Sequence, residues 1–310
     1  MGEAYAELQL GSLIQSLLDA VSYKSPRAMM SAGSGSADAL VCAMNAEVRT
    51  WTDDKASIPL FESMSKKAVS IVEFFYYTHP FEVKLAFAYY AWFFFYIDDV
   101  APQADLEKFQ LTALLGAPGP GLGPLAHFPR VLAALYAFYD PILANIMCCA
   151  ALEFITATAL EGRREVQRMP LRAAARAWPR YLRAKSGMAP GYAAAAFPRA
   201  AHPDISAFLQ ALPEIDTALA LLNDILSFYK EDLAGETMNY VSVRAAVGKM
   251  RPRAVIMEMV AEVADLHART AAILQSSPEA METWIALEHG VIAWHFALPR
   301  YKLTDLGLTW

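Results

Sequence analysis

The segment NDILSFYKE places three oxygen-bearing side chains at helical spacing. Asn223, Ser227 and Glu231 are four residues apart, and each such step on an α-helix turns by only about 40°, so the three oxygens share one face. Amide, hydroxyl and carboxylate oxygens are hard ligands that suit Mg²⁺, which usually shares its coordination shell with water and phosphate. Lys230 lies beside this face and could reach the same anion. The alternative is an amphipathic helix that becomes polar near its end.

An acid pair, Asp98 and Asp99, follows the apolar run FAYYAWFFFYI. Two adjacent carboxylates at the end of such a helix are costly to desolvate unless they are paired, hydrated or bound to a metal. They are therefore candidate metal ligands on a second helix, and a solvated helix end near a loop is the competing interpretation.

Basic residues are concentrated between Arg163 and Lys185, where seven arginines and one lysine occur. On a continuous helix, four of these arginines would form one stripe: Arg168, Arg172, Arg176 and Arg180. Otherwise each is solvated or paired with an acid.

Hard oxygen ligands on two helices, with lysine and arginine donors nearby, would bind Mg²⁺ and a multiply charged phosphate. With apolar side chains beneath it, such a site holds a ligand with an anionic head and a hydrocarbon body.

The elements that position these residues are predicted to be helices throughout, because strand-like alternation is scarce and Gly and Pro fall between the apolar runs. Pro80 should begin a helix and Pro141 should split one, since proline fits the first turn but disrupts a helix interior. The predicted helices span residues 6–23, 37–48, 61–77, 81–97, 105–115, 131–161, 171–186, 204–229, 238–247, 252–274 and 278–296.

Composition places the chain among globular proteins. Of its 310 residues, 56% are hydrophobic and 19% are charged, which excludes a disordered chain. No composition shift and no internal repeat marks a second domain, so residues 1–310 are predicted to form one all-α domain. The net charge of −6 gives no nucleic-acid-binding footprint.

The most apolar stretches are predicted to be buried helices, with no transmembrane segment among them. The run from Leu85 to Ile97 has only 13 uncharged residues, whereas a membrane span needs about 20. The N-terminus lacks a basic region followed by an apolar core, so no secretory signal is expected. Cys42, Cys148 and Cys149 show neither a disulfide framework nor metal spacing, which predicts a reducing, cytoplasmic location.

These segments resemble the class I terpene synthases, and most closely the fungal trichodiene synthase-like sesquiterpene cyclases. NDILSFYKE looks like that family's second metal motif, whose ligand positions are Asn223, Ser227 and Glu231, and Lys230 matches its diphosphate-binding lysine. Asp98 matches the metal-binding first member of the family's aspartate-rich motif. Order and spacing agree from about Tyr77 to Leu303.

Two further segments carry the resemblance. WPRYLRAKSG is similar to the stretch with the family's diphosphate-sensing arginine, which falls on Arg183, ahead of Gly187. HGVIAWHFALPRY ends like the family's arginine–tyrosine pair, here Arg300 and Tyr301. The second aspartate of the acidic motif is linked to that arginine in the family, which implies an ion pair between Asp99 and Arg300.

The resemblance implies an α-helical bundle around a central apolar pocket and a linear isoprenoid diphosphate substrate, most naturally farnesyl diphosphate. Three Mg²⁺ ions are implied, two held by Asp98 and the third by Asn223, Ser227 and Glu231. Arg183, Lys230, Arg300 and Tyr301 are expected to donate hydrogen bonds to the diphosphate. Ionisation and cyclisation would release pyrophosphate and a cyclic sesquiterpene or sesquiterpene alcohol.

The hydrocarbon pocket is expected to be lined by side chains one or two turns before the polar motifs. Aromatic faces there would stabilise a carbocation by about 0.5–2 kcal/mol each, and plain core packing is the competing interpretation for any one of them. The predicted lining residues are Phe87, Ala91, Phe94, Phe95, Leu219, Ala220 and Trp294.

Two other functions stay open at this point. A chain-elongating prenyl diphosphate synthase also uses Mg²⁺ and an all-α fold, but it normally carries two Asp-rich motifs. A non-catalytic, isoprenoid-binding helical protein is the other alternative, because after Asp99 the next acid is only Asp105. The resemblance also suggests a homodimer.

Overall fold

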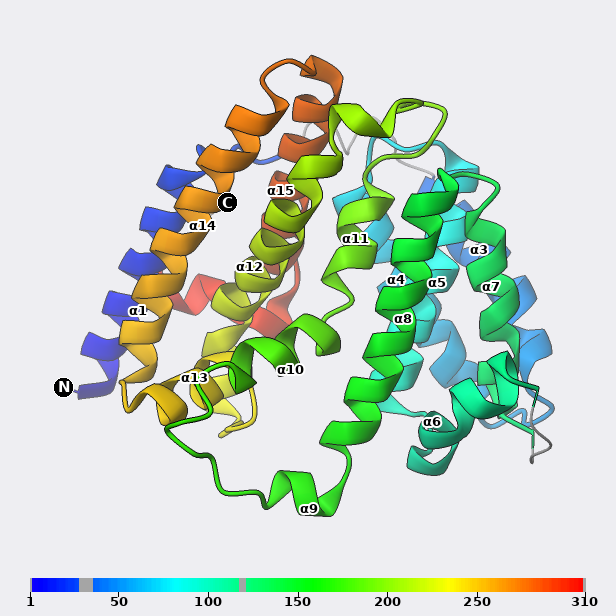
Figure 1. Ribbon diagram of the computed structural model, residues 1–310, viewed down its shortest axis with the longest axis horizontal. Coiled ribbons are helices and arrows are strands. Elements are labelled where there is room, and N and C mark those ends of the chain that lie inside the picture. The colour runs from blue at the N-terminus through cyan, green and yellow to red at the C-terminus, as the bar shows by residue number, and fades with distance from the viewer. Residues whose placement is uncertain (1, 28–35, 117–120, 309–310) are drawn as a thin grey trace. The chain divides into compact units, whose positions relative to one another are not determined.

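The computed structural model describes residues 2–27, 36–116 and 121–308, and every regular element in these ranges is helical. The predicted all-α fold class is confirmed. Figure 1 shows the helices, whose bounds are α1 Gly2–Ala20, α3 Ser36–Val48, α4 Ile58–Phe75, α5 Phe81–Asp99, α6 Gln103–Phe109, α7 Phe128–Leu135, α8 Pro141–Glu161, α9 Arg164–Gln167, α10 Trp178–Ser186, α11 Ala189–Ala195, α12 Leu212–Leu233, α13 Tyr240–Gly248, α14 Pro252–Leu274 and α15 Pro278–Ala297.

Proline and a capping aspartate set the start of the two most apolar helices. Pro80 precedes α5, as predicted, and Pro141 opens α8, so the long predicted helix is split into α7 and α8. The Asp140 carboxylate accepts a hydrogen bond from the Ile142 backbone N–H at 2.8 Å. This bond satisfies one of the free donors at the helix N-terminus.

Two predicted helices begin later than expected, and the reason is proline. The helix predicted over residues 171–186 begins at Trp178 with Pro179 in its first turn, and the one predicted from residue 204 begins at Leu212 with Pro213 in its first turn. An interior proline costs about 3 kcal/mol, so the helix starts where proline fits. The possible single stripe of four arginines does not form, because residues 168–177 are turns and irregular segments outside any helix. Helices α9 and α11 were not predicted.

The chain divides into two compact units. Unit 1 comprises residues 1–26, 169–189 and 206–310, and unit 2 comprises residues 27–168 and 190–205. The prediction of one domain over residues 1–310 stays a prediction.

In unit 1, α14 lies between α1 and α12, and α12 also contacts α15 (Figure 1). The face of α12 that packs in this bundle is apolar, with Ile215, Leu222 and Ile225 fully buried. A short 3₁₀ turn at Pro299–Tyr301 follows α15 and contacts α12. The fold of unit 1 thus brings the C-terminal Arg-Tyr pair to the helix that carries the NDILSFYKE motif.

In unit 2, α5 is the central helix and contacts α3, α4, α7 and α8. Most of its aromatic residues are buried, and the rings of Phe93 and Phe128 stack with centroids 4.3 Å apart. The indole N–H of Trp92 donates to the Phe61 carbonyl at 3.0 Å. Burial of this aromatic surface is the main source of stability for the unit.

Among the described residues, only α8 has the length and apolar composition of a membrane-spanning helix. Half of its most apolar stretch is buried inside the protein. The core helix of a folded protein meets the same criteria, so α8 is weak evidence for a membrane span.

Candidate active site

The three predicted oxygen ligands of NDILSFYKE lie on one helix. Asn223, Ser227 and Glu231 all fall within α12, which runs without a break to Leu233. The Ser227 side chain is buried, whereas those of Asn223 and Glu231 are partly accessible. Among the described residues, no three His, Cys, Asp or Glu side chains form a metal-binding group. A metal site on α12 therefore depends on the amide and hydroxyl oxygens as well as on the carboxylate.

The amide of Asn223 is held on its nitrogen side by a histidine from α15. Its Nδ2 lies 3.2 Å from Nε2 of His295, and Nδ1 of His295 lies 2.8 Å from the Val291 carbonyl oxygen. Burial lowers the pKa of His295 to about 4, so the ring is neutral near pH 7. The Oδ1 atom of Asn223 accepts a long hydrogen bond, 3.4 Å, from Nη2 of Arg183.

Arg183, the predicted diphosphate-sensing arginine, is anchored to α12 by Asp224. Its Nε lies 2.8 Å from both carboxylate oxygens of Asp224, and its Nη2 donates to the Ala220 carbonyl at 3.1 Å. Burial raises the pKa of Asp224 to about 6, although the guanidinium acts in the opposite direction. A Cβ atom at Gly187 would lie 2.0 Å from Nη1 of Arg183, so glycine leaves the space that this guanidinium fills.

The other predicted diphosphate donors gather around Tyr301. The Lys230 ammonium lies 5.9 Å from the Tyr301 ring centroid and donates to Oε1 of Glu231 at 3.0 Å. The Arg300 guanidinium, which is exposed, lies 5.3 Å from the same ring. Burial raises the pKa of the Tyr301 phenol above its usual value, which keeps the hydroxyl protonated as a donor.

One continuous series of contacts therefore joins the predicted residues of unit 1. The ring of His295 contacts Asn223 on one side and packs on Tyr301 on the other, with ring centroids 4.5 Å apart. In order, the series is Arg183, Asn223, His295, Tyr301, Lys230 and Glu231.

The acid pair lies in unit 2, at the last two positions of α5. Both aspartates are exposed, and Oδ2 of Asp99 lies 3.2 Å from the Lys67 ammonium. This ion pair is accessible to water, so it contributes little stability. The C-terminus of a helix carries partial negative charge, and carboxylates there favour a bound cation. The pairing of Asp99 with Arg300 stays a prediction, and Lys67 is the partner that the structure gives for Asp99.

The predicted pocket residues of α5 belong to the aromatic packing of unit 2. Phe87 is buried with its ring centroid 4.9 Å from that of Tyr76, and Ala91 is fully buried. Phe94 is partly accessible and stacks on Phe154 at 4.8 Å. The Lys67 ammonium lies 5.4 Å from the ring centroid of Phe95.

The predicted pocket residues of unit 1 flank the site on α12 and α15. Leu219 is buried, and Ala220 supplies the carbonyl that accepts from Arg183. Trp294 packs on Tyr301 with ring centroids 5.4 Å apart. The role of all these side chains as a hydrocarbon pocket stays a prediction.

Sequence reasoning missed two residues of this site, Asp224 and His295. Asp224 lies within the recognised motif, but its partner Arg183 is 41 residues away, and no local spacing links the two. His295 is 72 residues from Asn223. Only its place in the HGVIAWHFALPRY segment, next to the Arg-Tyr pair, could have indicated it.

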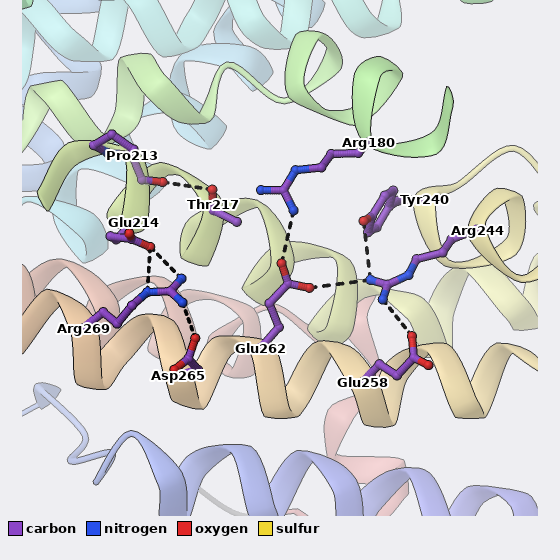
Figure 2. A network of polar contacts seen from close by, with 10 residues as sticks. All are labelled: Arg180, Pro213, Glu214, Thr217, Tyr240, Arg244, Glu258, Glu262, Asp265 and Arg269. Atoms are coloured by element: carbon purple, nitrogen blue, oxygen red, sulfur yellow. Dashed lines mark hydrogen bonds and ion pairs between the residues drawn. The ribbon is translucent and has the colours of Figure 1, made fainter. Parts of the chain in front are cut away.

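Figure 2 shows how α10, which carries Arg183, is fixed to its neighbours. One helical turn before Arg183, Arg180 donates to Glu262 of α14 at 3.2 Å. Glu262 also lies 3.7 Å from Arg244 of α13, which pairs with Glu258 at 2.8 Å. These ion pairs are at least partly accessible, so each is worth at most about 1 kcal/mol. The Arg180–Glu262 pair joins α10 to α14, and the two Arg244 pairs join α13 to α14.

Comparison with known proteins identifies the family. The family model described as trichodiene synthase matches residues 63–307. The terpene synthase BipA of Cochliobolus sativus is 36% identical over 245 residues, which are 76% of this chain and 75% of that protein. The longiborneol synthase of Gibberella zeae is 30% identical, covering 74% of this chain and 69% of its own. The (E)-beta farnesene synthase of Metarhizium brunneum is also 30% identical, with 74% and 72% covered.

The fold is similar to that of solved structures. A mutant of the SVS_A2 protein from ancestral sequence reconstruction superposes with a TM-score of 0.62 over 89% of this chain and 87% of its own. The two sequences are only 16% identical, so this similarity concerns the fold alone.

Proposed function

The chain belongs to the trichodiene synthase family of terpene synthases, and we propose that it is a Mg²⁺-dependent sesquiterpene synthase. Its substrate would be farnesyl diphosphate, and its products pyrophosphate and a cyclic sesquiterpene or sesquiterpene alcohol. The observation that carries this proposal is the contact series from Arg183 to Glu231, which gathers oxygen ligands and cationic donors in one unit.

The donor set on α12 fits Mg²⁺. An amide oxygen, a hydroxyl oxygen and a carboxylate on one helix are hard ligands, and three protein oxygens leave room for water and phosphate. Asn223, Ser227 and Glu231 would hold one ion, and Asp98 is the proposed ligand of two more. When bound, Mg²⁺ supplies positive charge that stabilises the departing diphosphate.

The cationic side chains of unit 1 would bind the diphosphate directly. Lys230 and Arg300 flank the Tyr301 ring, and Arg183 lies at the other end of the contact series. Hydrogen bonds to the leaving group become stronger as its charge develops, which lowers the barrier to breaking the C–O bond. Aromatic side chains such as Trp294 would then face the carbocation and supply no nucleophile.

The direct experiment incubates the protein with geranyl, farnesyl and geranylgeranyl diphosphates and Mg²⁺, followed by gas chromatography–mass spectrometry and a pyrophosphate assay. Cyclic C15 products from farnesyl diphosphate, lost with EDTA and in Asn223→Ala, are expected. Release of pyrophosphate without a cyclic product would contradict the cyclisation step.

The same experiment separates the alternatives. Incorporation of added isopentenyl diphosphate into a longer chain would indicate a prenyl diphosphate synthase. Tight isoprenoid binding without any Mg²⁺-dependent release of pyrophosphate would indicate a non-catalytic binding protein.

A further inference from the structure

His295 is the only residue for which the structure gives a hydrogen bond to the amide nitrogen of Asn223 within the described part of the chain. The imidazole is 1% exposed and sits near the C-terminal end of α15. Its ring nitrogens have separate partners, with Nδ1 facing the Val291 carbonyl oxygen at 2.8 Å and Nε2 facing Nδ2 of Asn223 at 3.2 Å.

The partner on Nδ1 determines what Nε2 can do. A carbonyl oxygen only accepts hydrogen bonds, so Nδ1 of His295 must carry the hydrogen that bonds Val291. In this tautomer Nε2 has a lone pair and only accepts. The group that it faces must therefore be a donor, and the NH₂ of the Asn223 amide is one.

This bond fixes the direction of the Asn223 oxygen. Rotating the amide by 180° would set Oδ1 against the Nε2 lone pair and lose the hydrogen bond, leaving a buried acceptor without a partner. In the observed orientation Oδ1 faces away from His295, and the contact that the structure gives for it among the described residues is the long one with Nη2 of Arg183, 3.4 Å. A carbonyl oxygen has two lone pairs, so Oδ1 retains the capacity to bind a metal ion.

We propose that His295 is a positioning residue that holds Oδ1 of Asn223 toward the Mg²⁺ site, by accepting a hydrogen bond from Nδ2. The inference rests on the proposed Mg²⁺-dependent function and adds a residue that acts through a ligand. Such indirect partners typically change metal affinity by about 10–100-fold when they are lost. His295 also packs on Tyr301, and the proposed role concerns only its hydrogen bond with Asn223.

The test compares two substitutions that split the functions of the ring. His295→Asn places an amide nitrogen near the position of Nδ1, which keeps the bond to Val291 but leaves no acceptor at the Nε2 position. His295→Gln places an amide oxygen near the Nε2 position and retains the acceptor. A matched control is His289→Asn, since His289 is a buried histidine on the same helix and its Nε2 faces the Val21 carbonyl at 3.4 Å.

The readout is binding of inorganic pyrophosphate, measured by isothermal titration calorimetry at a series of Mg²⁺ concentrations. We expect His295→Asn to raise the Mg²⁺ concentration for half-maximal pyrophosphate binding by about 10-fold or more. His295→Gln and His289→Asn should stay within about twofold of the wild type. Steady-state kinetics should show the same shift in the Mg²⁺ dependence.

A double-mutant cycle tests whether His295 acts through Asn223. In an Asn223→Ala background, His295→Asn should cause no further loss of Mg²⁺-dependent pyrophosphate binding, because the amide that it orients is absent. A further loss in that background, or a wild-type response of the single His295→Asn variant, overturns the inference. If His295→Asn does not fold, a 10-fold weakening in a folded His295→Gln variant also overturns it.

Failure of the proposed function looks different. If the wild-type protein itself shows no Mg²⁺-dependent pyrophosphate binding, both the function and the role of His295 are refuted. If the wild type binds pyrophosphate and His295→Asn binds it with the same Mg²⁺ dependence, the function stands and the role of His295 is refuted.

Discussion

Phe93 in unit 2 and Asn223 in unit 1 both lie on long helices, yet their surroundings differ in kind. The Phe93 ring stacks on Phe128 and on Trp51, with centroids 4.3 and 5.1 Å away, and the two phenylalanine rings have no polar atom that needs a partner. Asn223 instead donates a hydrogen bond to His295, and its neighbour Asp224 accepts one from Arg183. Unit 2 is thus stabilised mainly by the burial of aromatic side chains. The α12 face of unit 1 instead carries buried polar groups in defined orientations.

The two kinds of surroundings contribute differently to stability and to chemistry. Aromatic packing gives stability in proportion to the buried area and does not require a polar group to point in one direction. A buried polar group contributes little net stability but is costly to misplace, so its orientation is defined. Substitutions in the aromatic packing of unit 2 should therefore affect folding, and those of the polar residues on α12 should affect turnover.

The largest effect on stability is expected for Phe93→Ala. Removing this buried ring should lower the free energy of unfolding by about 3–5 kcal/mol, because a cavity is left in the aromatic stack. Urea denaturation followed by circular dichroism measures this loss. Phe81→Ala, at a residue that is 36% exposed, is the control and should change it by less than about 1 kcal/mol.

Glu231→Gln should have the opposite effect to Phe93→Ala, with a large loss of turnover and a small change in the free energy of unfolding. We expect kcat to fall by about 10²–10³-fold, as for loss of one electrostatic group in an active site. The free energy of unfolding should change by less than about 2 kcal/mol, because the side chain is partly accessible. Coupled pyrophosphate assays and urea denaturation provide the two values. Near-wild-type turnover would remove Glu231 from the proposed ligands.

Tyr76→Phe tests whether unit 2 depends on any polar contact. The Tyr76 hydroxyl is buried and donates to the Tyr192 carbonyl at 2.7 Å, which ties α4 to the α11 backbone. Leaving that carbonyl without its donor should cost about 1–3 kcal/mol of unfolding free energy. The exposed Tyr181→Phe serves as the control. No measurable loss for Tyr76→Phe would mean that this hydrogen bond does not help to position α11.

One histidine in each unit, His79 in unit 2 and His267 in unit 1, should make the free energy of unfolding depend on pH in opposite directions. In unit 2, burial lowers the pKa of His79 to about 4. The unfolded chain takes up this proton near pH 6.5, so stability falls as the pH drops from about 6.5 to 4, by up to about 1.4 kcal/mol per pH unit. In unit 1, the hydrogen bond that His267 donates to the Glu288 carboxylate raises the pKa of the histidine. Its contribution is complete below about pH 6.5 and is lost as the pH rises through the folded-state pKa.

Urea titrations between pH 4 and 8 measure these slopes. His79→Gln should flatten the acid side of the stability profile, and His267→Gln should flatten the side above pH 6.5. Identical profiles for the wild type and either variant would contradict the assigned pKa direction of that histidine.

Glu262→Gln should have the smallest effect. Glu262 joins Arg180 and Arg244 in the network of Figure 2, but these side chains are accessible to water. The free energy of unfolding should fall by less than about 1 kcal/mol. Turnover at saturating substrate and Mg²⁺ should stay within about threefold. A loss larger than 10-fold would show that the network positions Arg183 more tightly than accessible ion pairs normally do.

The helices themselves were largely predictable because they depend on local signals. Pro80 and Pro141 fix helix starts through a rigid φ angle and a missing N–H, and both predictions were confirmed. The same rule, not applied to Pro179 and Pro213, explains the two late starts. The short helix α11 was not predicted from local signals. Its last carbonyl accepts hydrogen bonds from Tyr139 at 3.2 Å and from His79 at 3.0 Å. Its surroundings are set by residues far away in the chain.

The sequence by itself determined that three oxygen ligands share one face of α12, since helical periodicity alone requires it. It also determined, through the order of its motifs, the family to which the chain belongs. Only the tertiary structure decided that Arg183 is anchored by Asp224 and that His295 orients the Asn223 amide. The orientation of a buried polar group depends on whichever partner the fold brings against it, and no local spacing specifies a partner 72 residues away.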